Sequence, residues 1–245
     1  MHQISYFIRL FVTEFFKNNI IKSSIKKGKD LDFYYLLIIL ISYLYASIPF
    51  SLIIPKIFCN IDPRKYGSGN LGASNVLRTA GVVAGVICYI LDFSKGLLGA
   101  GLPIILSNLR YIEENHWLIV LGALAAIIGH CWPIYLKFKG GKGVATAMGA
   151  ILMISPKIFL FFILIYLIVL FIYRYTSLAG LVSFGLLPIT GYLIKCFFSN
   201  RIGVPQFLFF SIIVVIIIFW RHQGNIKRLL SRTERRLGEK VKLEK

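Results

Sequence analysis

Residues 66–78 contain the first set of side chains whose types and spacing could bind an anion. The segment reads YGSGNLGASNVLR, so three glycines lie among small polar residues and the segment ends at Arg78. A glycine-rich backbone can fold tightly and direct its N–H groups at a ligand, and a planar guanidinium suits phosphate. A flexible loop between helices is the alternative, but a loop does not need so many small polar side chains beside an arginine. The pattern favours phosphate binding.

A second glycine-rich segment, residues 129–146, adds lysines. It reads GHCWPIYLKFKGGKGVAT and places Lys137, Lys139 and Lys142 around glycines directly before an apolar stretch. A glycine-rich turn with lysines at a helix N-terminus attracts anions through charge and through the helix dipole. The segment is not a Walker A loop, because no Ser or Thr follows Gly-Lys and the glycine spacing differs. The alternative is a loop whose lysines only set membrane topology, and His130 is as often structural as catalytic in such a place.

The third polar segment, residues 221–238, reads RHQGNIKRLLSRTERRLG. His222, Asn225 and Arg228 recur at helical spacing, so they share one face of a helix. A basic helix bound to anionic lipid at the membrane surface is the alternative. Lipid electrostatics would account for four further basic residues, Lys227, Arg232, Arg235 and Arg236. It does not require His222 or Asn225, which are therefore candidates for function.

The chain that must position these segments is strongly apolar and basic. Of its 245 residues 57% are hydrophobic, the mean hydropathy is +0.75 and the formal net charge is +18. A chain this apolar cannot stay solvated as a disordered protein, and the composition argues against a soluble basic domain. The apolar residues form long blocks, which is typical of helical membrane proteins. We therefore predict an all-α, polytopic membrane protein. Its four cysteines form no CxxC pair, so neither a zinc knuckle nor a disulfide framework is indicated.

Seven apolar stretches are predicted to cross the membrane, because a hydrocarbon core of about 30 Å needs about 20 helical residues. They are Phe33–Pro55, Thr79–Leu109, Trp117–Leu136, Gly143–Pro156, Ile158–Tyr173, Tyr175–Ile194 and Ile202–Trp220. The count falls to six if the chain crosses only once around Pro156. Cytoplasmic segments attract Lys and Arg, and the tail after Trp220 holds nine basic residues against three acidic ones. Seven spans place all three polar segments, and with them the active site, on the cytoplasmic face, whereas six would divide the basic segments between both sides.

Residues 1–32 form a predicted basic extension ahead of a membrane domain at 33–238, and residues 239–245 form a basic tail. Seven spans put the extension outside, although it carries six basic residues against three acidic ones. Its part Ile4–Ile21 is rich in Phe and Ile but interrupted by charges, which is typical of an interfacial amphipathic helix. It lacks the small-residue cleavage site of a signal peptide. An accessory surface helix and an over-long start of the reading frame are both open interpretations.

Asp92 and Lys95 lie three residues apart inside a predicted span. Ionisable residues in a span often mark function, and a buried structural ion pair is the equal alternative. The whole chain has only ten carboxylates, without a cluster that could hold a catalytic divalent metal. The His-based acyltransferase motif, with Asp five positions after His, is missing, and a Ser-His-Asp hydrolase is not indicated. We expect no metal, no cofactor and no nucleic-acid partner.

The three polar segments together resemble the PlsY family, the bacterial acyl-phosphate:glycerol-3-phosphate acyltransferases. The first family motif, GSGNxGATNxxR, matches residues 67–78 with Ser74 in place of Thr. The second, GHxxP followed by FKGGKGVAT, matches residues 129–146. The third, RHxxNIxRL with a later Glu, matches residues 221–229 and Glu234. Three long motifs in the right order make a chance agreement negligible.

The resemblance covers the chain from about Phe33 to Gly238, whereas residues 1–32 have no counterpart and Gly180 stands where many members have Ser. It implies transfer of an acyl group from acyl phosphate to the 1-hydroxyl of sn-glycerol 3-phosphate, giving lysophosphatidic acid and phosphate. This is the first acylation step of bacterial phospholipid synthesis, in the cytoplasmic (inner) membrane. The resemblance also implies a separate acyl-phosphate synthase upstream and no cofactor.

Individual roles follow from the motif matches. The resemblance implies catalytic roles for Ser68, Arg78, Lys142, His222 and Asn225. The residues expected to bind substrate or phosphate are Gly67, Asn70, Asn75, Lys139, Gly140, Gly141, Gly143, Thr146, Ser177 and Arg228. Glu234 is expected to brace the C-terminal helix, and Asp92 and Lys95 are further structural candidates. The proton of the attacking hydroxyl would go either to His222 as general base or to a substrate phosphate, whose second pKa is near 6.

Two other protein classes stay open on the sequence alone. A transporter or channel for an organic phosphate would suit seven spans and a basic cytoplasmic mouth. Transporters usually bind at the membrane midplane and often contain inverted repeats, and no internal repeat is visible. A lipid-binding scaffold would explain the basic tail but not the glycine-rich segments. Neither acyl-chain preference nor oligomeric state follows from the sequence.

Overall fold

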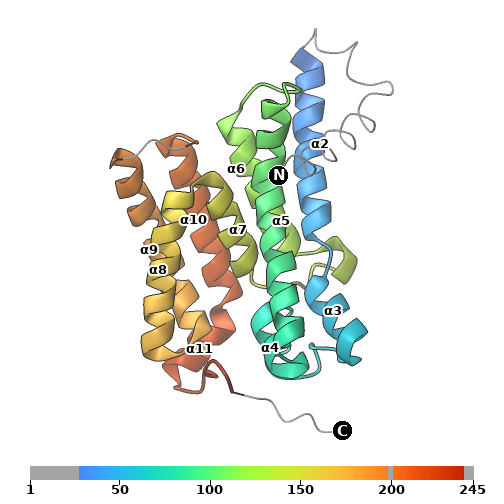
Figure 1. Ribbon diagram of the computed structural model, residues 1–245, viewed down its shortest axis with the longest axis vertical. Helices are drawn as coiled ribbons and strands as arrows, with labels where there is room; N and C mark the ends of the chain where they lie inside the picture. The colour runs from blue at the N-terminus through green and yellow to red at the C-terminus, as the bar shows by residue number, and fades with distance from the viewer. Residues whose placement is uncertain (1–27, 198–200, 240–245) are drawn as a thin grey trace.

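The computed structural model describes residues 28–197 and 201–239, and these residues form a bundle of helices (Figure 1). The long helices are α2 (Gly28–Ala46), α5 (Val82–Asn108), α6 (His116–Cys131), α8 (Pro156–Tyr173), α9 (Thr176–Phe197) and α10 (Val204–Arg221). The short ones are α3 (Phe50–Cys59), α4 (Ala73–Ala80), the 3₁₀ turn η1 (Ile134–Leu136), α7 (Val144–Ile154) and α11 (Gln223–Leu230). The all-α prediction is confirmed for this part of the chain. The predicted amphipathic helix 4–21 and the tail residues 240–245 lie outside the described residues.

Six helical stretches in the described part of the chain are long and apolar enough to cross a membrane. The first joins α2 and α3 across a short break, and the others are α5, α6 with η1, α8, α9 and α10. The seventh predicted span corresponds to α7, which has only 11 residues. At 1.5 Å per residue this helix covers about half of a 30 Å hydrocarbon core.

The predicted split at Pro156 is a helix boundary. The helix α7 ends at Ile154, and Pro156 is the first residue of α8. The Ser155 side chain caps α8 by accepting a hydrogen bond from the Ile158 N–H, and a proline is well tolerated at the first helical position because its missing N–H would have no partner there. The Ser-Pro pair therefore ends α7 early and begins the next helix at once.

The three polar segments meet at one end of the bundle. Figure 1 shows α4 and α11 at the same end, with the connection between α5 and α6 at the opposite end. The second segment is tied to this end by Arg221, the last residue of α10. Its guanidinium donates to the Gly140 carbonyl oxygen at 2.7 Å and to the Gly141 carbonyl oxygen at 2.9 Å. Which membrane face this end occupies stays a prediction.

Close packing against α5 fixes the position of α7, the helix that follows residues 140–143, which we call the GGKG turn. A methyl group at Gly96 would overlap the Thr146 carbonyl oxygen, and one at Gly149 would overlap the Phe93 carbonyl oxygen. Small residues allow helix backbones in membrane proteins to approach each other in this way. The Thr146 hydroxyl also donates to the Asp92 carbonyl oxygen at 2.9 Å. The N-terminus of α7 is thereby held in a defined position on α5.

We predict that Gly149→Ala destabilises the fold. Its new methyl group would displace the α5 backbone, and overpacking of this kind costs about 1–3 kcal/mol, so the thermal unfolding midpoint in detergent should fall. Gly185→Ala in α9 is the matched control, because its methyl group would lie 3.6 Å from the nearest atom of the Phe219 ring and meets no backbone. Equal unfolding midpoints for the two variants would contradict the close α5–α7 contact.

Candidate active site

A cavity of about 580 Å³ lies where the three polar segments meet. We call it the polar cavity. Most residues that the sequence predicts as functional line it. They are Gly67, Ser68, Asn70, Asn75, Arg78, Asp92, Lys142, Gly143, Ser177, His222, Asn225, Arg228 and Glu234. The structure therefore brings most of the predicted site residues together from segments that are far apart along the chain.

Three helices begin at the polar cavity. The lining includes Gly72 and Ala73 at the start of α4, Gly143 and Val144 at the start of α7, and the first turn of α9. Neither α4 nor α7 has a side-chain hydrogen bond capping its N-terminus. The first N–H groups of a helix have no partner within the helix, and the helix dipole makes this end positive. Together these helix ends favour an anion in the cavity.

Asn75 folds the glycine-rich loop that precedes α4. Its Oδ1 accepts a hydrogen bond from the Ser68 N–H at 2.9 Å, and its Nδ2 donates to the Pro63 carbonyl oxygen at 2.8 Å. Gly67 has φ +65°, and a methyl group there would overlap Asn75 Oδ1, so only glycine suits this turn. The buried Asn75 amide thus holds the loop in shape, while the exposed Ser68 lines the cavity.

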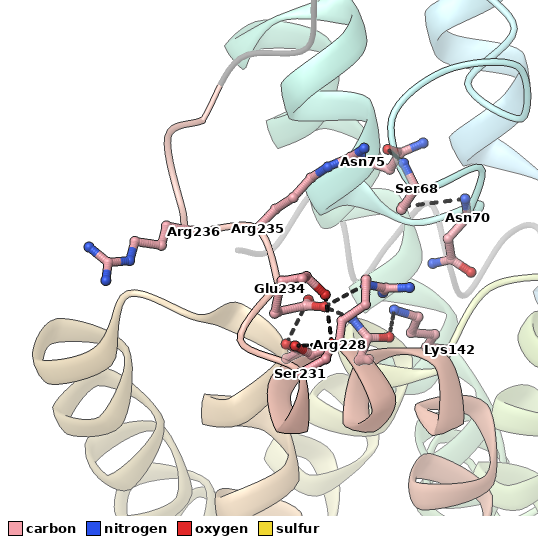
Figure 2. Close-up of polar contacts among 12 residues, drawn as sticks. Ser68, Asn70, Asn75, Lys142, Arg228, Ser231, Glu234, Arg235 and Arg236 are labelled. Atoms are coloured by element: carbon pink, nitrogen blue, oxygen red, sulfur yellow. Dashed lines mark hydrogen bonds and ion pairs between the residues drawn. The ribbon is translucent and has the colours of Figure 1, made fainter.

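Lys142 is aimed by a chain of hydrogen bonds that Figure 2 shows. Its ammonium donates to Asn225 Oδ1, and Asn225 Nδ2 donates to Glu234 Oε1 at 2.7 Å. Burial, with the nearby charges of Arg228 and Arg78 added and Glu234 opposing them, lowers the pKa of Lys142 to about 8. At neutral pH the side chain is still mostly cationic, and it gains from any anion that enters the cavity.

Glu234 joins three parts of the molecule. Besides Asn225, it accepts a hydrogen bond from the Ser177 hydroxyl at 2.9 Å and from Arg228 Nε at 2.7 Å. Burial alone would raise the pKa of Glu234, but the hydrogen bonds from Asn225, Arg228 and Ser177 hold it below its usual value. These contacts join Glu234 to α9 and α11, and the bracing role expected for it stays a prediction. They also show that Ser177 and Arg228, expected to bind phosphate, contact this carboxylate in the structure.

His222 follows α10 and is buried against the polar cavity. Its Nδ1 lies 2.7 Å from the Ile218 carbonyl oxygen. A carbonyl only accepts, so Nδ1 carries the proton and Nε2 carries the lone pair. Burial, together with the charge of Lys142, lowers the pKa of His222 to about 4. The imidazole is therefore neutral at pH 7 and accepts hydrogen bonds through Nε2.

Four of the residues expected to bind substrate do not line the polar cavity. Lys139 is exposed. The Gly140 and Gly141 N–H groups donate to the carbonyl oxygens of Cys131 and His130 at 3.2 and 3.1 Å, so they already have partners inside the turn. The Thr146 side chain is bonded to Asp92. The two glycines shape the turn that presents Lys142, rather than facing the cavity themselves.

Asp92 and Lys95 form the buried ion pair that was one of the two alternatives. Lys95 Nζ lies 2.8 Å from Asp92 Oδ1, and the Ser51 hydroxyl donates to Asp92 Oδ2 at 2.8 Å. His130 Nδ1 lies 3.5 Å from Asp92 Oδ1. A methyl group at Gly141 would overlap the His130 ring, so this cluster packs directly under the turn that carries Lys142. Paired in this way, the charges can be tolerated in the bundle interior.

The segment after α11, residues 231–237, belongs to the third polar segment, but the sequence analysis assigned Arg235 to lipid electrostatics and not to the site. We call this segment the C-terminal strap. Its residues Thr233, Glu234 and Arg235 line the polar cavity. Arg78 Nη2 donates to the Arg235 carbonyl oxygen at 3.3 Å, and the Leu237 N–H donates to the Arg174 carbonyl oxygen at 2.7 Å. The strap thus connects α4 with the start of α9. An irregular segment has no periodicity that could separate Arg235 from its exposed neighbours.

Comparisons with known proteins show the family of the chain. Residues 36–232 match the family described as glycerol-3-phosphate acyltransferase. The chain belongs to the glycerol-3-phosphate acyltransferase family. A Macrococcus caseolyticus member is 44% identical over 198 residues, covering 81% of this chain and 94% of that protein. A Thermotoga maritima member, glycerol-3-phosphate acyltransferase 2, is 39% identical over 199 residues, covering 81% and 94%.

Solved structures of this acyltransferase family share the fold. The integral membrane glycerol 3-phosphate acyltransferase PlsY (YgiH) in its glycerol 3-phosphate form matches with a TM-score of 0.70 and 36% identity, over 84% of this chain and 96% of that one. The lysophosphatidic acid form of PlsY matches with a TM-score of 0.69 and 35% identity over the same shares. The expectation of membership in the PlsY family is confirmed, and the chain is an acyltransferase. Among the described residues, no group of three or more His, Cys, Asp or Glu could hold a metal ion.

The pKa of Lys142 predicts a pH-dependent anion affinity. Because that pKa is about 8, the ammonium form is lost between pH 7 and pH 9, whereas a phosphate monoester with a second pKa near 6 stays dianionic. The Kd of a monoester such as glycerol 3-phosphate should therefore rise about tenfold from pH 7 to pH 9, as measured by isothermal titration calorimetry in detergent. Lys142→Arg keeps its charge and should flatten the dependence. A wild-type Kd that does not change over this range would contradict the role of Lys142.

Proposed function

We propose that the protein transfers an acyl group from an acyl phosphate to the 1-hydroxyl of glycerol 3-phosphate. The products are 1-acyl-glycerol 3-phosphate and inorganic phosphate. The proposal rests on the polar cavity, which combines two kinds of lining. One part is lined by cations, and we call it the cationic mouth; another is lined by apolar side chains, and we call it the apolar wall. Arg78, Lys142, Arg228 and Arg235 line the mouth, and helix N-termini add to their field. Two phosphate groups meet at the reacting atoms, and bringing them together needs this positive potential.

The apolar wall suits an acyl chain. It is formed by Tyr89 on α5, Met148 on α7, and Ile163, Tyr166 and Leu167 on α8. Pockets for apolar ligands are lined mainly by such side chains, with a few polar groups that fix orientation. The proposed donor would place its phosphate at the cationic mouth and its chain along this wall. The PlsY structures in glycerol 3-phosphate and lysophosphatidic acid forms are relatives whose ligands combine the same two chemistries.

The reaction needs no metal ion to activate its donor. An acyl phosphate is a mixed anhydride with a good leaving group, so the glycerol hydroxyl attacks the carbonyl carbon and the bond from that carbon to the phosphate oxygen breaks. The cations at the mouth stabilise the negative charge that develops on the leaving phosphate. The hydroxyl proton passes to a phosphate oxygen of the substrates, whose second pKa is near 6. His222, neutral at pH 7, positions the glycerol moiety through Nε2, and Asn225 orients Lys142.

The proposed location is the bacterial cytoplasmic (inner) membrane, with the polar cavity and the C-terminus on the cytoplasmic side. The excess of basic residues after Trp220 supports this orientation. Glycerol 3-phosphate would then reach the cavity from the cytoplasm. The acyl donor would be supplied by a separate acyl-phosphate synthase, as the resemblance to the PlsY family implies.

Purified protein in detergent tests the reaction. With labelled glycerol 3-phosphate, lysophosphatidic acid should form from palmitoyl phosphate and not from palmitoyl-CoA, without added metal. Arg78→Ala should abolish the product, because it removes a guanidinium from the mouth. Lys227→Ala, which removes an exposed charge of α11 outside the polar cavity, should keep wild-type activity. Folded wild-type protein that forms no product from either donor would overturn the proposal and direct the work to uptake assays in liposomes.

The role of His222 is tested by His222→Gln. Loss of a general base costs about 10²- to 10⁴-fold, whereas loss of one positioning hydrogen bond costs about tenfold or less. We expect the turnover number of the variant to stay within about tenfold of wild type, and the pH profile of the turnover number to keep its shape. A loss of about a hundredfold or more would instead assign the base to His222.

A further inference from the structure

Arg235 differs from the other basic residues of the C-terminal strap in what surrounds it. It lines the polar cavity, and its Nη1 atom is buried without a hydrogen-bond partner among the described residues. Its neighbour Arg236 is exposed, and the Arg236 guanidinium lies over the Tyr175 ring at 5.8 Å. In Figure 2 the Arg235 side chain runs from the strap toward Asn75, while Arg236 points away. The Arg235 side chain is thus partly buried at the polar cavity, whereas the Arg236 side chain is exposed outside it.

Among the described residues, the carboxylates that line the polar cavity are paired with cations other than Arg235. Of the two carboxylates that line the cavity, Glu234 is paired with Arg228 and Asp92 with Lys95. Within the described part of the chain, neither Arg78 nor Arg235 forms an ion pair with a carboxylate. The two arginines are close enough for the charge of Arg235 to lower the pKa of Arg78, after the larger effect of burial and against the opposing charge of Glu234. Cations that repel one another at a cavity wall are stabilised by an anion between them.

The backbone fixes the position of Arg235 independently of its side chain. Arg78 Nη2 donates to the carbonyl oxygens of Arg235 and Arg236, at 3.3 and 3.5 Å. Glu234, the preceding residue, is held by its three hydrogen bonds. The guanidinium of Arg235 is therefore presented at the cavity by a segment that is anchored on both sides, and a substitution of its side chain leaves these anchors in place.

We propose that Arg235 is a further phosphate ligand of the site, binding the same phosphate group as Arg78. A guanidinium donates two parallel hydrogen bonds to a phosphate, which satisfies a buried N–H that otherwise lacks a partner. The ligand is a phosphate dianion, either that of glycerol 3-phosphate or that of the acyl donor and its leaving group. This inference rests on the proposed function for the identity of the substrates, but not for the presence of a phosphate site.

Direct binding to the full-length protein in detergent is the first test. Isothermal titration with inorganic phosphate and, separately, with glycerol 3-phosphate gives a Kd for wild type, Arg235→Ala, Arg235→Lys and Arg236→Ala. Arg235→Ala should raise the Kd of at least one probe about 10- to 100-fold, as expected for a charge-assisted hydrogen-bonded pair. Arg235→Lys should recover part of the loss, since it restores the charge without the planar pair of donors. Arg236→Ala should bind like wild type.

Steady-state kinetics identify the phosphate that Arg235 binds. A raised KM for glycerol 3-phosphate in Arg235→Ala assigns it to the acceptor, and a raised KM for acyl phosphate, with weaker inhibition by inorganic phosphate, assigns it to the donor. Wild-type affinity for both probes in Arg235→Ala overturns the proposal. So does an equal loss in Arg236→Ala, which would mean a general effect of charge or of the strap, or wild-type protein that binds neither probe. Arg235-dependent binding in a protein that transfers no acyl group would keep the ligand role and reject the proposed reaction.

Discussion

The Glu234 carboxylate is the anion on which the shape of the positively charged cavity depends. It receives hydrogen bonds from Ser177 on α9 and from Asn225 and Arg228 on α11, and Asn225 in turn orients Lys142 ahead of α7. The positively charged side chains Arg228 and Lys142, which would otherwise repel each other, are thus linked through one carboxylate. Because its oxygens are occupied by these contacts, the carboxylate organises the cations without neutralising all of them. The cationic mouth is left for substrates.

The same arrangement recurs deeper in the bundle. Asp92 is bonded to Lys95 and Ser51, and its backbone carbonyl accepts from Thr146 at the start of α7. Close glycine contacts bring α7 against α5 at this level. Polar groups in a membrane interior are expensive unless they are fully paired, so this cluster also ties the GGKG turn to the helices beneath it. Glu234 thus holds the cationic residues of the polar cavity in place, and Asp92 holds the start of α7 against α5.

The sequence was sufficient where the pattern is local and the residue type is decisive. The apolar blocks predicted the membrane helices, Pro156 predicted a helix boundary, and the glycine-rich motifs predicted most of the cavity lining. It could not tell which motif residues hold the loops in shape. Asn75 and the Gly140–Gly141 pair belong to the motifs yet serve the loops themselves, because the direction of each side chain and N–H depends on tertiary contacts. Arg235 was assigned to lipid electrostatics for a related reason, since the irregular strap gives no periodicity from which burial could be inferred.

The position of Leu167 bears on the route by which the acyl donor of the proposed reaction would reach the polar cavity. This residue lines the polar cavity and is also 52% exposed on the apolar outer surface of α8, where hydrocarbon replaces water as the solvent. An acyl phosphate could therefore enter sideways from the bilayer, while glycerol 3-phosphate arrives from the aqueous phase. The rate would then follow the mole fraction of donor within the membrane, and dilution with inert lipid would slow the reaction even at a constant amount of donor per volume of solution.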